Sequence, residues 1–298
     1  MVALALTGLR VSAEEPPSDS NPPAAVQEAL DLLTYDGMIG VEDRLKKVVP
    51  LGDVAVPYLV RAYEVGADQN RGMVAMAICR INTALSREAA RRIISENKFR
   101  LGTSIAIYEY PAEFDLELAP VLIRAMRDES LTFWASERLV RMIEREPSRA
   151  GLIVDALDDR EKDQSYVRSL GDVLTCVAIT GCYSPPSLDK YVAYHNAFWR
   201  QWWAQHKDEN GFEWLIEPAT SRYPDSRENA LQRMGYLRVE AARPYLLAAL
   251  KSPEEKERYW GAVGLSELNG WPPIADRATE ANRKAYVEAV LRRLAGEK

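Results

Sequence analysis

VPYLVRAYEVGADQNRGMVAMAICRIN, residues 56–82, and RPYLLAALKSPEEKERYWGAVGLSELN, residues 243–269, are two copies of one pattern. They align without a gap and share the pairs Pro57/Pro244, Tyr58/Tyr245, Leu59/Leu246, Ala62/Ala249, Arg71/Arg258, Ala75/Ala262 and Asn82/Asn269. The second copy starts 187 residues after the first, which is six periods of about 31 residues, a spacing typical of repeat proteins. The sequence therefore predicts a stack of small units that bury one another.

Shorter copies lie between these two, at residues 119–126 (APVLIRAM) and 150–157 (AGLIVDAL). In all four copies an aliphatic residue precedes an alanine by three positions, so that both lie on one helical face. The pairs are Leu59/Ala62, Leu122/Ala125, Ile153/Ala156 and Leu246/Ala249. The small alanine allows a neighbouring helix to come close, and the aliphatic residue fills the space beside it.

Each copy predicts two helices. In the first, apolar residues recur at i, i+3, i+4 and i+7 from Val56 to Tyr63, and the proline of each copy fits the first turn, where no N–H donor is needed. The second helix is more apolar and covers residues 73–81 in the first copy and residues 260–268 in the second copy.

The second copy also carries signals for where its second helix begins and ends. Ser252-Pro253 followed by two acids predicts an N-cap with proline at N1, and Asn269-Gly270 predicts a stop. No stretch alternates apolar and polar residues long enough to predict a sheet, so the expected fold is all-α.

The two helix phrases, Ala/Val/Arg-Pro-Tyr/Val-Leu-x-x-Ala and Arg-x-x-x-Ala-x-x-Leu/Ile-x-x-Leu/Ile-Asn, resemble HEAT-like repeats. The form they resemble is the short bacterial one of phycobilin lyase accessory proteins, with about 30 residues per helical pair. The resemblance is clearest over 53–82, 117–158 and 227–269. It implies a right-handed α-α superhelix, HEAT or armadillo-like, with other proteins as the usual partners. The resemblance does not imply lyase activity, because this sequence shows no residues that would provide it.

Charge argues against nucleic acid as a partner, because the chain has a net charge of −6 and that affinity needs clustered Lys and Arg. Arg138, Arg141 and Arg145 do share one helical face, but acids surround them, so a solvated face is expected. A solenoid grows without splitting, so residues 24–298 are predicted to form one domain, with an irregular aromatic-rich insertion at about 160–211.

The N-terminal segment has the order of a secretory signal. An apolar run from Val2 to Leu9 precedes Val11-Ser12-Ala13, which fits the small-residue rule for cleavage, and residues 14–23 form a proline-rich spacer. We expect residues 1–13 to be the remnant of a signal sequence and the protein to be exported or periplasmic. The basic n-region is missing, so a cytoplasmic location is the alternative. No segment is apolar for long enough to span a membrane.

Cysteine and histidine predict little chemistry. Cys176 and Cys182 are six residues apart and could form a disulfide or stay two buried thiols. His195 and His206 are the only histidines, and they are too far apart on one helix to share a metal. We therefore expect no metal site.

The segment from Tyr191 to His206 has a heavy aromatic face. Such a face is usually core. The alternative is an aromatic anchor for a partner, for which Trp199 and Trp202 are the candidates, and which requires exposed indoles.

No nucleophile elbow, phosphate loop or zinc motif occurs, so the sequence predicts no catalytic residue, no cofactor and no enzyme activity. The favoured function is a non-catalytic scaffold that holds a protein segment in a helical groove. The alternative is an enzyme or enzyme-accessory protein of the HEAT-like lyase type, with a pocket at 160–211.

Stacked repeats align equivalent positions into a row along one face. The positions off the apolar stripe include Tyr58, Arg61, Arg124, Arg127 and Tyr245. Tyr and Arg are enriched at binding hot spots, so this row is the predicted binding surface, and its arginines are predicted to contact an acidic segment of another protein.

Overall fold

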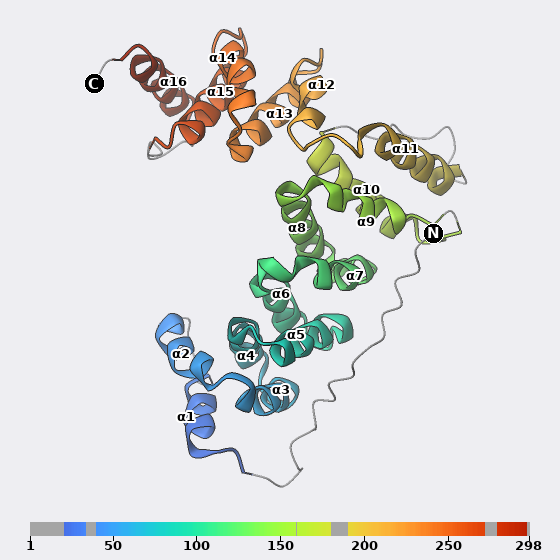
Figure 1. Cartoon of the computed structure of the whole chain (residues 1–298), viewed down its shortest axis with the longest axis vertical. Coiled ribbons are helices and arrows are strands. Elements are labelled where there is room, and N and C mark those ends of the chain that lie inside the picture. The colour runs from blue at the N-terminus through green and yellow to red at the C-terminus, as the bar shows by residue number, and fades with distance from the viewer. Residues whose placement is uncertain (1–20, 34–39, 159, 180–189, 272–278, 297–298) are drawn as a thin grey trace. The chain divides into compact units, whose positions relative to one another are not determined.

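The computed structural model describes residues 21–33, 40–158, 160–179, 190–271 and 279–296, and all regular elements within these ranges are helical (Figure 1). The predicted all-α fold is confirmed. The chain divides into two compact units, unit 1 (residues 1–139) and unit 2 (residues 140–298). Unit 1 contains α1 (Ala24–Leu33), α2 (Val41–Val48), α3 (Val56–Val65), α4 (Asp68–Ile81), α5 (Ala84–Glu96), α6 (Arg100–Glu109) and α7 (Asp115–Ala125). Unit 2 contains α9 (Ala150–Asp155), α10 (Gln164–Ala178), α11 (Tyr191–His206), α12 (Ile216–Ala219), α13 (Pro224–Leu237), α14 (Arg243–Ala249), α15 (Glu255–Leu268) and α16 (Glu280–Leu294), while α8 (Glu129–Arg145) contributes residues to both.

The repeated segments form helix pairs, α3–α4 in unit 1 and α14–α15 in unit 2. Helices α4 and α15 have 14 residues each, and their first residues, Asp68 and Glu255, are separated by the same 187 positions as the two sequence copies. Pro57 and Pro244 both lie in the first turn of their helices, as predicted. The pairs fit a HEAT-like repeat. The right-handed sense of the superhelix stays a prediction.

The arginine shared by the two copies closes each pair. Arg71 of α4 donates from Nε to the carbonyl of Tyr63, at 2.9 Å, near the end of α3. Arg258 of α15 donates to the carbonyls of Ser252 and Pro253, at 2.7 and 2.6 Å, just after α14. Arg71 thus satisfies a carbonyl in the last turn of α3, which has no partner inside the helix, whereas Arg258 satisfies two carbonyls of the loop between α14 and α15.

The ends of α15 match the sequence signals in part. The helix stops where predicted, with Asn269 as C-cap and Gly270 in the left-handed region at φ 64°. The start differs, because α15 begins at Glu255 with Glu254 as N-cap and without a side-chain cap. Ser252 instead accepts a hydrogen bond from the Glu254 N–H (3.1 Å) and donates one to the Glu257 carboxylate (2.7 Å). The prediction that Ser252 is the N-cap of α15 is therefore wrong. Its hydroxyl instead forms hydrogen bonds within the preceding loop and with the buried Glu257 carboxylate.

The aliphatic residue of each copy lies in the core, as the pattern predicts. Leu59, Leu122, Ile153 and Leu246 are all buried. The alanine three positions later is buried only in Ala249 and is half-buried in the other three copies. In all four copies, therefore, only the aliphatic residue identifies the buried face of the helix.

In unit 2, helix α15 lies very close to both α13 and α14. A Cβ added at Gly235 of α13 would lie 2.7 Å from the Cα of Gly264 in α15. A Cβ added at Gly261 would lie 2.8 Å from the carbonyl oxygen of Leu246 in α14. Glycines thus allow α15 to approach both neighbours at backbone contact distance.

The range predicted to be an insertion, 160–211, contains α10, α11 and the segment 180–189, which lies outside the described residues. Helix α10 follows α9 as the second helix of a pair, and α11 packs against both. The prediction of one solenoid over 24–298 and of an insertion stays open. Residues 1–13 and most of the 14–23 spacer lie outside the described ranges, and so the predicted export is untested. Among the described helices, none is long and apolar enough to cross a membrane.

Candidate functional site

The predicted row divides between the two units. Tyr58 and Arg61 lie on α3, and Arg124 and Arg127 lie at or just after the end of α7, all in unit 1, whereas Tyr245 lies on α14 in unit 2. The three arginines are exposed and the two tyrosines are half-buried. Their accessibility is compatible with binding.

Arg124 and Arg127 border a hollow of about 640 Å³ in unit 1. Its sides come from the end of α5, the end of α7 and the start of α8. Buried Ile94, Val121 and Leu131 form its apolar part. The hollow is therefore an open site with apolar surface and two guanidiniums at its border.

Two of the three acids that line this hollow, Glu96 and Asp128, already have partners, and the third, Glu129, is exposed. Glu96 accepts from Lys98 at 3.0 Å and from Arg92 at 3.1 Å, and the Lys98 hydrogen bond lowers the pKa of the Glu96 carboxyl. Asp128 accepts from the Ser130 N–H at 2.9 Å, and the bonds from Ser130 lower its pKa. Both carboxylates therefore stay ionised and engaged at neutral pH.

Arg124 differs from these groups. Among the described residues it has no hydrogen-bond or ion-pair partner, although its side chain is exposed beside the apolar surface of the hollow. An unpaired guanidinium offers five N–H donors in a planar fork that matches a carboxylate. Arg124 is thus available to an external anion.

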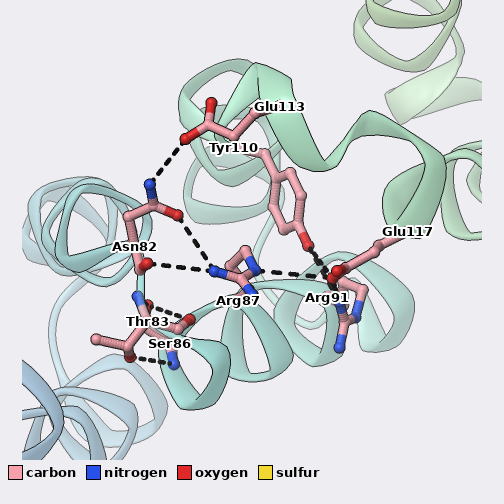
Figure 2. A network of polar contacts seen from close by, with 8 residues as sticks. All are labelled: Asn82, Thr83, Ser86, Arg87, Arg91, Tyr110, Glu113 and Glu117. Atoms are coloured by element: carbon pink, nitrogen blue, oxygen red, sulfur yellow. Dashed lines mark hydrogen bonds and ion pairs between the residues drawn. The ribbon is translucent and has the colours of Figure 1, made fainter.

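A polar network fixes α7, which carries this arginine, against α5 (Figure 2). Arg91 of α5 and Glu117 of α7 form an ion pair, and Arg87 reaches the same carboxylate oxygen at 3.7 Å. The Tyr110 hydroxyl accepts from Arg91 at 3.2 Å and donates to Glu117 at 3.4 Å. Two arginines one turn apart thus hold a single acid of the next repeat.

The start of α5 belongs to the same network (Figure 2). Thr83 and Ser86 form a capping box, in which each hydroxyl accepts from the other residue's backbone N–H, at 3.2 and 2.8 Å. Asn82 donates from its amide to Glu113 at 2.9 Å and accepts from Arg87 at its backbone carbonyl at 3.2 Å. The cap and the ion pairs together determine where α5 lies relative to α7.

Arg138 does not lie on a solvated face, and that prediction is wrong. Its side chain is only 8% exposed and forms an ion pair at 2.7 Å with Asp115, which is 1% exposed. The guanidinium also donates to the carbonyls of Tyr108 and Tyr110, at 3.2 and 2.6 Å. Burial of both charges is tolerated because each has several hydrogen bonds. The neighbouring acids in the sequence gave no sign of which one the arginine would contact.

The aromatic helix α11 packs largely as core. Trp199 is 0% exposed, with the rings of Phe198 and Trp202 at 5.0 and 5.7 Å in edge-to-face contact. A fully buried indole cannot contact a partner on the surface, so Trp199 is a packing residue. Trp202 is half-buried between His206, stacked at 5.2 Å, and Trp214 at 5.1 Å. Of the two predicted anchors, only Trp202 retains solvent contact.

His195 is buried in the same cluster. Its Nε2 accepts from the Trp199 indole N–H at 3.3 Å, and Tyr191 stacks on the ring at 5.4 Å. Burial lowers the pKa of His195 below its ordinary value, against smaller opposing effects of Asn196 and Asp172. Gly171 of α10 leaves the space, since a Cβ there would lie 2.1 Å from Nε2. The histidine is thus a neutral core residue.

Unit 2 also contains a cavity of about 350 Å³ that sequence analysis missed. It is lined by Arg141, Ile143, Glu144, Arg145, Val177, Gly211, Trp214, Leu215, Arg233, Tyr236 and Leu237. These residues come from four separate segments, so no local motif could reveal it. Trp199, Trp202 and His206 are not among its lining residues.

The cysteines form no described bridge. Cys79 is buried in α4, and burial raises the pKa of its thiol to about 12, which leaves it unreactive. Cys176 lies on the exposed side of α10, and Cys182 lies outside the described residues, so the predicted disulfide stays untested. Within the ranges that the structure describes, no three His, Cys, Asp or Glu side chains are grouped to hold a metal ion.

No protein-family model and no curated protein matches the chain. Among solved structures, the chain is similar to human deoxyhypusine hydroxylase in complex with glycerol, at 14% identity and with a TM-score of 0.32. The match covers 82% of this chain and 96% of that chain.

The sequence-based prediction that the chain is not an enzyme is contradicted, because the matched protein is a hydroxylase. The prediction rested on the general behaviour of repeat folds and on missing motifs, and neither excludes catalysis. The similarity assigns no reaction, substrate or residue to this chain.

Proposed function

We propose that the protein binds an extended segment of another protein along the helical surface of unit 1, and that carboxylates of that segment contact Arg124, the nearby Arg127 and Arg61 of α3. The single observation that carries the proposal is Arg124, exposed and without a partner among the described residues, beside a hollow with apolar surface. Helical repeat proteins commonly use such surfaces for extended partners.

The surroundings of Arg124 support this choice of ligand. Of the three acids of the hollow, Glu96 and Asp128 are engaged by their own neighbours, and neither they nor the exposed Glu129 forms an ion pair with Arg124 among the described residues. The apolar part of the hollow can accept an aliphatic or aromatic side chain next to the bound carboxylate. A segment that combines an acid with an apolar residue therefore fits both features.

The test is affinity capture from an extract of the protein's own cells, with the full chain as bait. The bait is compared with the triple variant Arg61→Ala, Arg124→Ala, Arg127→Ala. We expect a protein enriched by the parent to be reduced tenfold or more with the triple variant. The melting temperature should stay within about a degree or so, since exposed substitutions rarely change stability by more than about 0.5 kcal/mol.

A matched control removes the same charge elsewhere. Arg160, Arg168 and Arg222 are exposed arginines of unit 2, and their triple alanine variant should capture the partner as the parent does. Equal loss with both triple variants would show a general charge effect. Unchanged capture with the Arg61, Arg124, Arg127 variant would refute the proposal.

A second function, an enzyme or enzyme-accessory protein related to the lyase-type HEAT-like proteins, is favoured only by the cavity in unit 2. Two of its lining residues, Val177 and Gly211, come from the 160–211 range. A cavity of this size occurs in enzymes and in small-molecule binders alike. Ligand binding at this cavity is therefore the first property to test.

A further inference from the structure

Helix α16 packs against α15 with one of its faces (Figure 1). Tyr286, Val287 and Val290 are buried in the core of unit 2, and Arg283 forms an ion pair with Glu255 of α15 at 2.8 Å. The side chains on the opposite face of α16 are mostly exposed. This outer face of α16 is therefore open to a partner.

The outer face carries a row of charges that alternate in sign at every fourth position. The row consists of Glu280, Lys284, Glu288 and Arg292, and all four side chains are exposed. Residues four positions apart form a ridge on a helix surface. Glu280 and Lys284 form an ion pair within the helix at 2.6 Å, whereas Glu288 and Arg292 have no hydrogen-bond or ion-pair partner among the described residues. The row therefore offers both a carboxylate and a guanidinium to a partner.

Small side chains lie next to this charged row. Ala281 and Ala285 are exposed and Ala289 is half-buried, and these three alanines are also four positions apart. A row of alanines leaves a shallow groove, so a second helix can come close enough for its own charges to meet the charged row. Leu291 lies on the other side of the charged row and is 45% exposed, so it adds apolar surface.

We propose that the outer face of α16 is an interface between two copies of this protein, in which the two α16 helices lie antiparallel about a two-fold axis near position 286. This register places Glu280 opposite Arg292 of the second copy and Lys284 opposite Glu288 of the second copy. The two-fold axis repeats both contacts, which gives four pairs of opposite charge. Two ridges of this kind pack at a crossing angle of about −50°, the commonest class of helix contact in globular proteins.

The charge pattern selects this register over its alternatives. A shift of the antiparallel register by four positions in one direction places Glu280 opposite Glu288, and in the other direction it places Lys284 opposite Arg292. A parallel two-fold pair places each charge beside its own copy. Like charges in contact oppose association, so only the register centred on position 286 matches the whole row. The same register also places Leu291 opposite the small Ala281 of the second copy.

The interface is small, because it consists of two helices of 15 residues. Such a contact belongs with the weak interfaces, and we expect a dissociation constant of about 10–500 µM. Its ion pairs are exposed at the edges, so salt should weaken it. This surface lies in unit 2 and is independent of the protein-binding surface proposed for unit 1.

The test is sedimentation equilibrium of the full chain from about 5 µM to about 1 mM at low salt. The parent should dimerise reversibly. Lys284→Glu and Glu288→Lys should each weaken dimerisation tenfold or more, because each change places two pairs of like charge in the interface. Lys207→Glu, the same reversal at an exposed position of unit 2 outside α16, should leave it unchanged. A parent that stays monomeric throughout this range, or variants that dimerise as the parent does, would overturn the proposal.

A mixture of the two variants distinguishes the proposed register from damage to the fold. In a mixed dimer, Glu at position 284 of one copy faces Lys at position 288 of the other, and the unchanged Lys284 and Glu288 face each other. An equimolar mixture of Lys284→Glu and Glu288→Lys should therefore dimerise about as strongly as the parent, although neither variant does so alone. Failure of the mixture to dimerise would show that these positions do not face each other and would refute the antiparallel register.

Discussion

The pairs α3–α4 and α14–α15 are two copies of one sequence pattern, yet they meet their neighbours in different ways. Inside each pair the copies agree: the first helix has a proline in its first turn, its central leucine is buried, and an arginine of the second helix, Arg71 or Arg258, donates to backbone carbonyls at the end of the first helix or just after it. Between pairs they differ. Helix α15 has Gly261 and Gly264 where α4 has Val74 and Ala77.

The glycines determine which neighbour comes close. In α15, Gly264 meets Gly235 of α13 at backbone contact distance. In α4 the close approach is at Gly72, where a Cβ would lie 2.6 Å from the Ile105 side chain of α6, and the equivalent position in α15 is Tyr259. The shared pattern therefore specifies the helix pair, whereas the positions of small residues specify how pairs stack.

The largest effect is expected when the α13–α15 crossing is blocked. Gly235→Ala places a Cβ 2.7 Å from the Gly264 Cα, and a backbone atom cannot rotate away, so the two helices must separate. Overpacking of this kind costs about 1–3 kcal/mol and occasionally more, and we expect the upper end. Denaturant unfolding of the full chain measures it. Asn229→Ala, an exposed change on the same helix, should stay within about 0.5 kcal/mol. Similar stability of both variants would show that the glycine contact is unimportant.

The next largest loss of stability is expected when the arginine that both copies share, Arg71 or Arg258, is replaced. Arg71→Met and Arg258→Met keep the aliphatic stem but leave carbonyls of the preceding segment without a partner, at a cost of about 1–2 kcal/mol each. Arg71 also lies 3.3 Å from the centroid of the Phe99 ring, so its loss should cost slightly more. Thermal melts of the two variants beside Arg168→Met, an exposed control, measure the difference. If only one of the two arginines matters, the copies do not share this role.

The helix pairs could be predicted because they are encoded locally. The period, the prolines and the buried leucines depend on residues within one or two turns, and all were visible in residues 56–82. The stacking of pairs could not be predicted in the same way. Gly235 and Gly264 are 29 residues apart, and their contact depends on where two separate pairs meet.

The candidate binding sites, like the stacking of the helix pairs, could be predicted only where the local sequence determines them. The exposed arginines could be identified from the repeat, because equivalent positions share a face. The buried pair of Arg138 and Asp115 was misjudged, since burial depends on the end of α6 as well as on the helix carrying the arginine. The cavity around Arg233 could not be predicted, because four separate segments build it.

The two units should also respond differently to pH, because both histidines lie in unit 2. Burial lowers the pKa of His195 below 6.5, so between the two pKa values the unfolded state binds more protons than the folded state. This contribution to stability is complete above pH of about 6.5 and is lost as pH falls through the lowered pKa of the folded state. We expect unit 2 to lose stability over this range, with unit 1 unaffected by histidine.

The measurement is denaturant unfolding between pH 7 and pH 5.5, with tryptophan fluorescence and helical circular dichroism compared. His195→Gln should lower stability at pH 7 and flatten the pH curve, since the titrating group is gone. If the stability of the His195→Gln variant falls with pH as steeply as that of the parent, a group other than His195 is responsible for the pH dependence.

The smallest expected effect has the opposite sign and concerns one position of the pattern. Ser266 of α15 is 3% exposed, and its hydroxyl has no hydrogen-bond partner among the described residues. Its equivalent in α4 is Cys79, whose thiol contacts the Ala106 carbonyl at 3.6 Å. An unsatisfied buried hydroxyl costs free energy, and alanine favours helix slightly more than serine, so Ser266→Ala should stabilise the protein by about 0.5 kcal/mol. Cys79→Ser, which places a stronger donor near Ala106, should be close to neutral. A loss of about 1 kcal/mol or more in Ser266→Ala, measured by denaturant unfolding, would show that the hydroxyl has a partner in solution, such as an ordered water, and that the two copies are more alike at this position than their side chains indicate.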